Sequence, residues 1–171
     1  LCIAAPTYAL ADTATPKLAI THVPAYGTSE YVTGRVLVED PDAFNPSDYH
    51  VTLYVEVSTS PKYWVKPWAD TPYADVLADG SFAIQYGIFS TDRSAENLHV
   101  LLIPADYQPG VNDLSGAQGV AYDYVKITRA TDGSGYVMDP VDRELPPQSK
   151  PSGLSVSNDK IAVDVGLYTS G

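Results

Sequence analysis

Cysteine and positive charge are what this sequence has least of. The 171-residue chain holds one cysteine, Cys2, so an internal disulfide, a zinc site built on cysteines and Cys–His catalysis are excluded. Ten lysines and arginines stand against 21 aspartates and glutamates, for a formal charge of −11. The negative electrostatic field of such a chain repels phosphate backbones and anionic lipid. We therefore expect no nucleic-acid partner.

Long apolar runs and helical periodicity are missing too. No stretch reaches the roughly 18 apolar residues of a transmembrane helix, so we predict no membrane span. The chain is also shorter than a complete (β/α)8 barrel, which takes about 200 residues or more. No long segment has apolar residues at i, i+3 and i+4, and 14 prolines and 12 glycines interrupt the chain. Helices are therefore expected to be minor.

What the sequence has instead is alternation. In residues 49–58 the apolar side chains Val51, Leu53, Val55 and Val57 occupy every second position, which predicts a strand with one buried face. Comparable runs, separated by turn clusters, are 17–23, 31–39, 81–86, 97–103 and 122–129. Six such strands predict an all-β fold, an immunoglobulin-like antiparallel β-sandwich. The one helix we predict is a single turn within 90–98, capped by Thr91 or Asp92.

Composition divides the chain into four parts. Residues 1–11 are uncharged and end in Ala-Leu-Ala before Asp12, the pattern of a truncated export signal; a first strand and a lipoprotein anchored at Cys2 are the alternatives. Residues 12–129 form the sandwich. Residues 130–158, rich in proline, glycine and serine, are predicted to be an interdomain linker, and 159–171 the start of a truncated second domain. We predict a secreted or cell-surface protein.

Aromatic and polar side chains suited to ligand binding are most concentrated in residues 61–82, which contain both tryptophans. Sugars offer a C–H face that stacks on aromatic rings and a rim of hydroxyls that polar side chains bind. Trp64 shares one side of an extended chain with Lys62 and Lys66, a pattern more common at a surface than in a core, although either tryptophan could instead fill the core. The predicted ligand-binding residues are Tyr63, Trp64, Lys66, Trp68, Asp70, Tyr73 and Asp75.

Motifs for catalysis and cofactors are absent. The sequence has no GxSxG, GxGxxG, GxxxxGK[ST] or HExxH. Acidic clusters at Asp40 and Asp42, and at Asp132 and Asp139, lack the spacing of a calcium loop, so we predict no cofactor, with a structural Ca²⁺ left as an alternative. The predicted roles of the three histidines, on separate strands, are structural rather than catalytic; they are His22, His50 and His99.

The order of several motifs resembles a known module. These motifs are VTGRV (32–36), YHVTLYVEV (49–57), YWVKPWADTP (63–72), LADGSF (77–82), TDRSAENLHVLLIPADYQP (91–109) and VKITR (125–129). Together they resemble an accessory β-sandwich module found beside the catalytic domains of secreted bacterial glycoside hydrolases. The segment GIFST before Asp92 departs from the glycine-rich turn of that pattern. The ending KIAVDVGLYTSG (160–171) is similar to the first barrel strand of family 17 β-glucanase-like glycosidases.

These resemblances imply a covalently linked catalytic barrel and a non-catalytic role for the present segment, which we expect to bind a polysaccharide or oligosaccharide. Two alternatives remain at this stage. One is a structural spacer that binds no sugar, which two interior tryptophans would favour. The other is a small hydrolase, which would need two carboxylates about 5–9.5 Å apart in a cleft, one of them desolvated.

Overall fold

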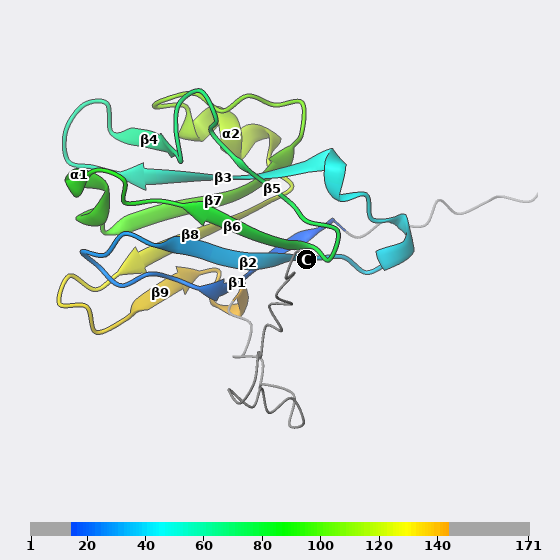
Figure 1. Cartoon of the computed structure of the whole chain (residues 1–171), viewed down its shortest axis with the longest axis horizontal. Coiled ribbons are helices and arrows are strands. Elements are labelled where there is room, and N and C mark those ends of the chain that lie inside the picture. The colour runs from blue at the N-terminus through cyan, green and yellow to red at the C-terminus, as the bar shows by residue number, and fades with distance from the viewer. Residues whose placement is uncertain (1–14, 144–171) are drawn as a thin grey trace, which may run out of the picture.

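The fold is a sandwich of two antiparallel sheets (Figure 1). The structure, a computed structural model, describes residues 15–143. Sheet A has the order β1–β2–β6, and sheet B the order β4–β3–β7–β8–β9, with β5 also paired to β3. The strands of sheet A are β1 (Lys17–His22), β2 (Tyr31–Leu37) and β6 (Ser81–Gln85). The strands of sheet B are β3 (Tyr49–Glu56), β4 (Tyr63–Lys66), β5 (Ala74–Asp75), β7 (Asn97–Pro104), β8 (Asp123–Arg129) and β9 (Tyr136–Asp139).

Short helical elements join the strands. The described part of the chain has two α-helices, α1 (Ser90–Arg93) between β6 and β7 and α2 (Leu114–Val120) between β7 and β8. Three 3-10 turns complete the described elements: η1 (Pro41–Ala43), η2 (Pro46–Asp48) and η3 (Val141–Arg143). Within residues 15–143, no helix has the length and apolar character needed to traverse a bilayer.

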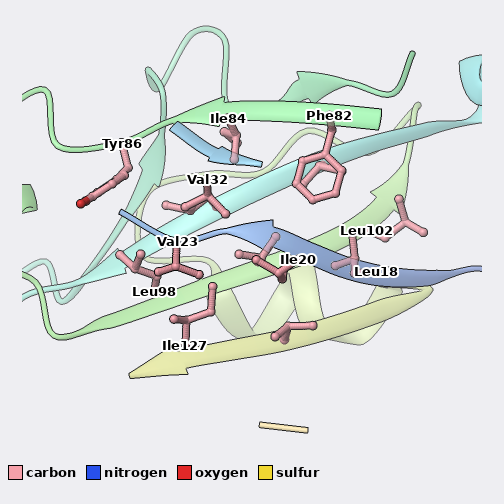
Figure 2. Packing of buried hydrophobic residues seen from close by; sticks show 14 of the residues in the cluster. Leu18, Ile20, Val23, Val32, Phe82, Ile84, Tyr86, Leu98, Leu102 and Ile127 are labelled. Atoms are coloured by element: carbon pink, nitrogen blue, oxygen red, sulfur yellow. The ribbon is translucent and has the colours of Figure 1, made fainter. Parts of the chain in front are cut away.

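The main core fills the space between the sheets. On β3 the alternating side chains Val51, Leu53 and Val55 are fully buried, as their period-two spacing requires. Figure 2 shows side chains of β1, β2 and β6 from sheet A meeting those of β7 and β8 from sheet B. The residues labelled there include Leu18, Ile20, Val32, Phe82, Ile84, Leu98, Leu102 and Ile127.

A second apolar cluster covers the other face of sheet B. Here α2 places Leu114 and Ala117 against Tyr54, Leu101 and Ile103. The central strand β7 is therefore buried on both faces, which explains why it is apolar at nearly every position.

The first and last described segments meet at Asp123, the first residue of β8. Its carboxylate accepts hydrogen bonds from the Leu18 backbone N–H at 2.6 Å and from Arg143 at 2.8 and 3.0 Å. A charge-assisted, bidentate pair of this kind is among the stronger polar contacts in proteins. β1 and the segment that follows β9 are thus fastened at one end of sheet B.

The predicted all-β sandwich with antiparallel sheets is confirmed, and all six predicted strands are present within two residues of their predicted ends. The immunoglobulin-like detail stays a prediction. The sequence pattern did not predict the strands β4, β5 and β9 or the helix α2. The predicted helical turn is present as α1. The Asp92 carboxylate accepts a backbone hydrogen bond there, as predicted, from the Phe89 N–H at 3.1 Å, but the N-cap position is held by Phe89 and not by Thr91 or Asp92.

The predicted linker is also wrong at its start. Residues 130–143 belong to the sandwich, because a turn returns the chain as β9 alongside β8. The Ala130 N–H donates to the Gly135 carbonyl at 2.8 Å, and Gly133 adopts φ +76° within the turn, a conformation that glycine favours. The remainder of that linker, the export signal at 1–11 and the second domain at 159–171 lie outside the described residues.

Gly34 gives a direct test of the packing between β1, β2 and β6. A Cβ at this position would overlap the Ala19 carbonyl oxygen and the Phe82 ring. We expect Gly34→Ala to lower the free energy of unfolding by about 1–3 kcal/mol, the usual effect of overpacking, in chemical denaturation. Gly119→Ala is the control, since a Cβ there meets no atom within 4 Å, and alanine favours the helix. Equal stability of the two variants would contradict this packing.

Candidate functional site

Both tryptophans lie at the β4 edge of sheet B with their indoles partly open to solvent. Trp64 is 39% exposed and Trp68 is 47% exposed. Trp64 is on β4, where pairing with Val55 of β3 fixes its position. Trp68 begins a short loop closed by two hydrogen bonds between its backbone and that of Thr71, at 3.2 and 3.4 Å. The exposure predicted for the indoles is present, and interior packing of both is excluded.

Phe89 extends this aromatic edge, and the sequence reading did not select it. Its ring meets the Trp68 indole edge to face at a centroid distance of 6.0 Å and is 55% exposed. It comes from the residue just before α1, which Figure 1 shows beside the end of β3. The available signal was the GIFST segment, where a phenylalanine replaces the small residues expected of a turn. We call Trp64, Trp68 and Phe89 the aromatic edge.

The prediction that Lys66 binds ligand is wrong. It is only 3% exposed, and its ammonium lies 2.6 Å from an Asp92 carboxylate oxygen, itself in a residue 2% exposed. The Phe89 ring lies above the same ammonium at 5.5 Å. The Lys66 side chain leaves β4 on the side that Trp64 occupies, as predicted, but α1 folds over it. Lys66 therefore joins α1 to β4 and is not available to bind sugar hydroxyls.

Tyr63 projects from the opposite face of β4 and belongs to a polar network there. Its ring meets His99 edge to face at 5.6 Å. His99 lies between Glu56, at 3.3 Å from Nε2, and the Tyr124 hydroxyl, at 2.7 Å from Nδ1. Glu56 also binds the Lys62 ammonium at 2.8 Å. Tyr63 is thus separated from the two indoles by the strand itself.

The other predicted residues lie along the loop after β4. Asp70 is exposed between Trp68 and Thr71. Tyr73 stacks on His50 with ring centroids 3.9 Å apart, so that one face of its ring is covered. Asp75, with an exposed carboxylate 3.3 Å from His50, is on β5. Of the seven predicted residues, Trp64, Trp68 and Asp70 gather near the aromatic edge, and Tyr73 and Asp75 form a separate pair at the other half of β3.

An open groove of about 720 Å³ adjoins the segments that carry the aromatic edge: its lining includes Lys62, two residues before Trp64, and Thr91, two residues after Phe89, but none of the three aromatic side chains themselves. It is bounded by the turn from β3 to β4, by α1 and by the first residues of β7. Figure 1 shows these segments at the same end of the molecule. Apart from Val57, the lining side chains are hydroxyls, amides, carboxylates and one ammonium. They include Glu56, Lys62, Thr91, Glu96, Asn97 and Asn112.

The groove carboxylate of Glu56 is held in its charged form. Partial burial acts to raise its pKa, but hydrogen bonds to Lys62 and His99 outweigh burial, and the pKa falls below its ordinary value. Burial lowers the pKa of His99, with the hydrogen bond to Glu56 opposing the shift. A neutral imidazole can satisfy both contacts, with Nε2–H facing Glu56 and Nδ1 accepting from Tyr124. A proton donor in hydrolysis needs the reverse shift, a carboxyl with a raised pKa.

Two of the four aspartates considered for metal binding, Asp40 and Asp132, accept backbone hydrogen bonds in turns. An Asp40 carboxylate oxygen accepts from the Asp42 N–H at 3.1 Å, and Asp132 accepts from the Ser134 N–H at 2.9 Å. Within the part of the chain that the structure describes, no three His, Cys, Asp or Glu side chains come together as a metal site requires. Asp40 and Asp132 each have a local structural role.

The geometry defines an all-β sandwich with an aromatic edge and an adjoining polar groove. Comparison with known proteins gives no matching family model, no significantly similar curated protein and no significantly similar solved structure. Function must therefore be argued from the site itself.

The Lys66–Asp92 pair predicts a large stability effect. Lys66→Met would leave a buried carboxylate without its cation, and we expect the free energy of unfolding to fall by about 3–5 kcal/mol. The matched control is Lys62→Met, which removes an exposed ammonium and is expected to have a much smaller effect. Denaturant unfolding measures both. Similar losses in the two variants would show that the buried pair contributes no more than a surface pair.

The buried His99 predicts a pH dependence of stability. Because its pKa is lower in the folded state, the unfolded chain takes up a proton first as the pH falls through about 6.5, and stability decreases in that range. Burial also lowers the pKa of His50, which contributes in the same direction. We expect His99→Gln to reduce the slope of unfolding free energy between pH 7 and pH 5 without abolishing it. An unchanged slope would contradict the assignment to His99.

Proposed function

We propose that this chain is a non-catalytic carbohydrate-binding or accessory module of a secreted polysaccharide-degrading glycoside hydrolase. The observation that carries the proposal is the aromatic edge beside a polar groove. Sugar rings need both surfaces, since an aromatic face contacts their C–H groups while side chains such as amides and carboxylates bind their hydroxyls. Neither surface alone would distinguish a sugar from another amphipathic ligand.

The supports of this site are stiff, which favours binding by reducing the ordering cost. β4 is paired to β3 over four residues. The buried Lys66–Asp92 contact fixes α1, and with it Phe89, against that strand. Farther along, the Thr52 hydroxyl donates to the Pro72 carbonyl at 2.7 Å in the interior. The loop carrying Trp68 and Asp70 is thus held at both ends.

In this proposal the indoles of Trp64 and Trp68 stack on sugar rings, Phe89 adds apolar contact beside Trp68, and Asp70 binds hydroxyls from the loop. Tyr63 has a supporting role on the other face of β4. Tyr73 and Asp75 would contact only a ligand long enough to reach β5. The site is therefore an extended surface, suited to a chain of sugars more than to a single one.

Hydrolysis by this segment is the less favoured alternative. Glu56 is the groove carboxylate with a shifted pKa, and the shift is downward. It is also engaged by Lys62 and His99, at 2.8 and 3.3 Å. These contacts support a binding role for the groove over general acid catalysis, which requires a carboxyl that keeps its proton near neutral pH.

Affinity electrophoresis of the full chain against soluble β-glucans, xylans and mannans tests the proposal. We expect at least one glycan to retard the protein, and Trp64→Ala or Trp68→Ala to weaken binding about tenfold, which corresponds to about 1.4 kcal/mol. Tyr122→Ala is the control. That tyrosine is 42% exposed, and its N–H bonds the Leu102 carbonyl at the other end of β7 from the groove.

The outcomes separate the proposed roles. Retardation that is lost with the tryptophans and kept with the tyrosine variant supports sugar stacking. A wild-type protein that migrates freely on every glycan would refute binding and favour the spacer role. Equal losses in all three variants would indicate a general effect on folding, which unfolding curves of the same proteins would reveal.

A further inference from the structure

The groove beside the aromatic edge has a charge pattern that bears on its ligand. Its lining contains the carboxylates of Glu56 and Glu96 and a single ammonium, Lys62. That ammonium is engaged by Glu56 at 2.8 Å, so the two charges largely cancel. Glu96 is exposed, and no basic side chain within residues 15–143 forms an ion pair with it. The groove therefore carries one net negative charge, on a chain whose total is −11.

Glu96 is held in place by its backbone. Its carbonyl oxygen accepts from the Arg129 N–H at 2.8 Å, at the point where β8 ends beside the start of β7. Arg129 is itself buried and donates through its guanidinium to the carbonyls of Ala25 and Arg93, at 3.2 and 3.1 Å. The backbone that carries the Glu96 side chain is thus fixed beside the groove.

Two amides supply neutral hydrogen-bonding groups. Asn97 accepts from the Thr128 hydroxyl at 2.9 Å through its Oδ1, which leaves its NH₂ group to donate. Asn112 has φ +61°, and its N–H donates to the Tyr63 carbonyl at 2.7 Å. Asparagine tolerates this left-handed conformation better than most residues. The amides, with the Thr91 hydroxyl, provide donors and acceptors that suit hydroxyl groups.

We propose that this groove is the subsite that selects the glycan class: it accepts uncharged sugar units, favours amino sugars that carry a positive charge, and rejects uronic acid units. This inference rests on the proposed function. A uronate would bring a further carboxylate beside Glu96, while the one ammonium among the lining residues of the groove, Lys62, is already paired with Glu56. Like charges at an interface disfavour binding. An ammonium-bearing sugar would instead be attracted to Glu96. The attraction is strongest at low salt, because at 0.1 M salt ions already screen charges that lie more than about 10 Å apart.

The test uses the full chain and three probes: a soluble neutral β-glucan, glucosamine oligomers and polygalacturonate, with binding measured by calorimetry at low and high salt. We expect polygalacturonate not to bind. Glucosamine oligomers should bind more tightly than neutral oligomers at low salt, and Glu96→Gln should reduce that preference about two- to fivefold, the range of an exposed charge pair. Glu39→Gln is the matched control, an exposed glutamate beyond the far end of β2.

The reverse experiment is Glu96→Lys, which should admit polygalacturonate, while Glu39→Lys should not. Binding of polygalacturonate by the wild type, or equal effects of the Glu96 and Glu39 variants, would overturn the selection role while leaving sugar binding intact. Failure of all three probes and of the neutral glycan panel to bind the wild type would overturn the proposed function and this inference together. Unfolding curves of the Glu96 variants confirm that any change in binding occurs in a folded protein.

Discussion

The contact between Lys66 and Asp92 is the constraint on which the proposed binding surface depends. It links β4, at the edge of sheet B, to α1, which connects the two sheets. The same lysine lies beneath the Phe89 ring, and that ring meets Trp68. The Lys66–Asp92 pair therefore holds Phe89 in position against Trp68 in the aromatic edge. Buried pairs seldom add much net stability, and here the arrangement they enforce is the more important effect.

Most of the sandwich could be predicted because its strands follow the simplest pattern, alternation of apolar and polar residues. The strand β9 could not, because Gly133 and Gly135 give its hairpin the composition of a linker. The helix α2 contains two glycines in seven residues, which weakens any helical signal. In both cases tertiary contacts, such as Met138 in the main core and Leu114 over sheet B, select the structure.

The candidate site could be predicted only in part, for a related reason. Alternation placed Lys66 and Trp64 on one side of the chain, which is where they lie, but local pattern says nothing of what packs against that side. Likewise the predicted structural histidines each have a carboxylate neighbour, at 3.2 or 3.3 Å. For His99 the partner is Glu56, brought near by the pairing of β3 with β7. Contacts between distant residues of this kind have no signature in a single sequence.

The hydrogen bonds of Leu18 and Arg143 to Asp123 place both ends of the described chain at one end of β8. β8 runs from this junction to Arg129, beside Glu96, a path of roughly 20 Å at about 3.3 Å per residue. The first strand and the last described residues therefore meet at the opposite end of β8 from Glu96 and the groove. A ligand held in the proposed groove would thus lie about 20 Å, the length of β8, from the junction at Asp123.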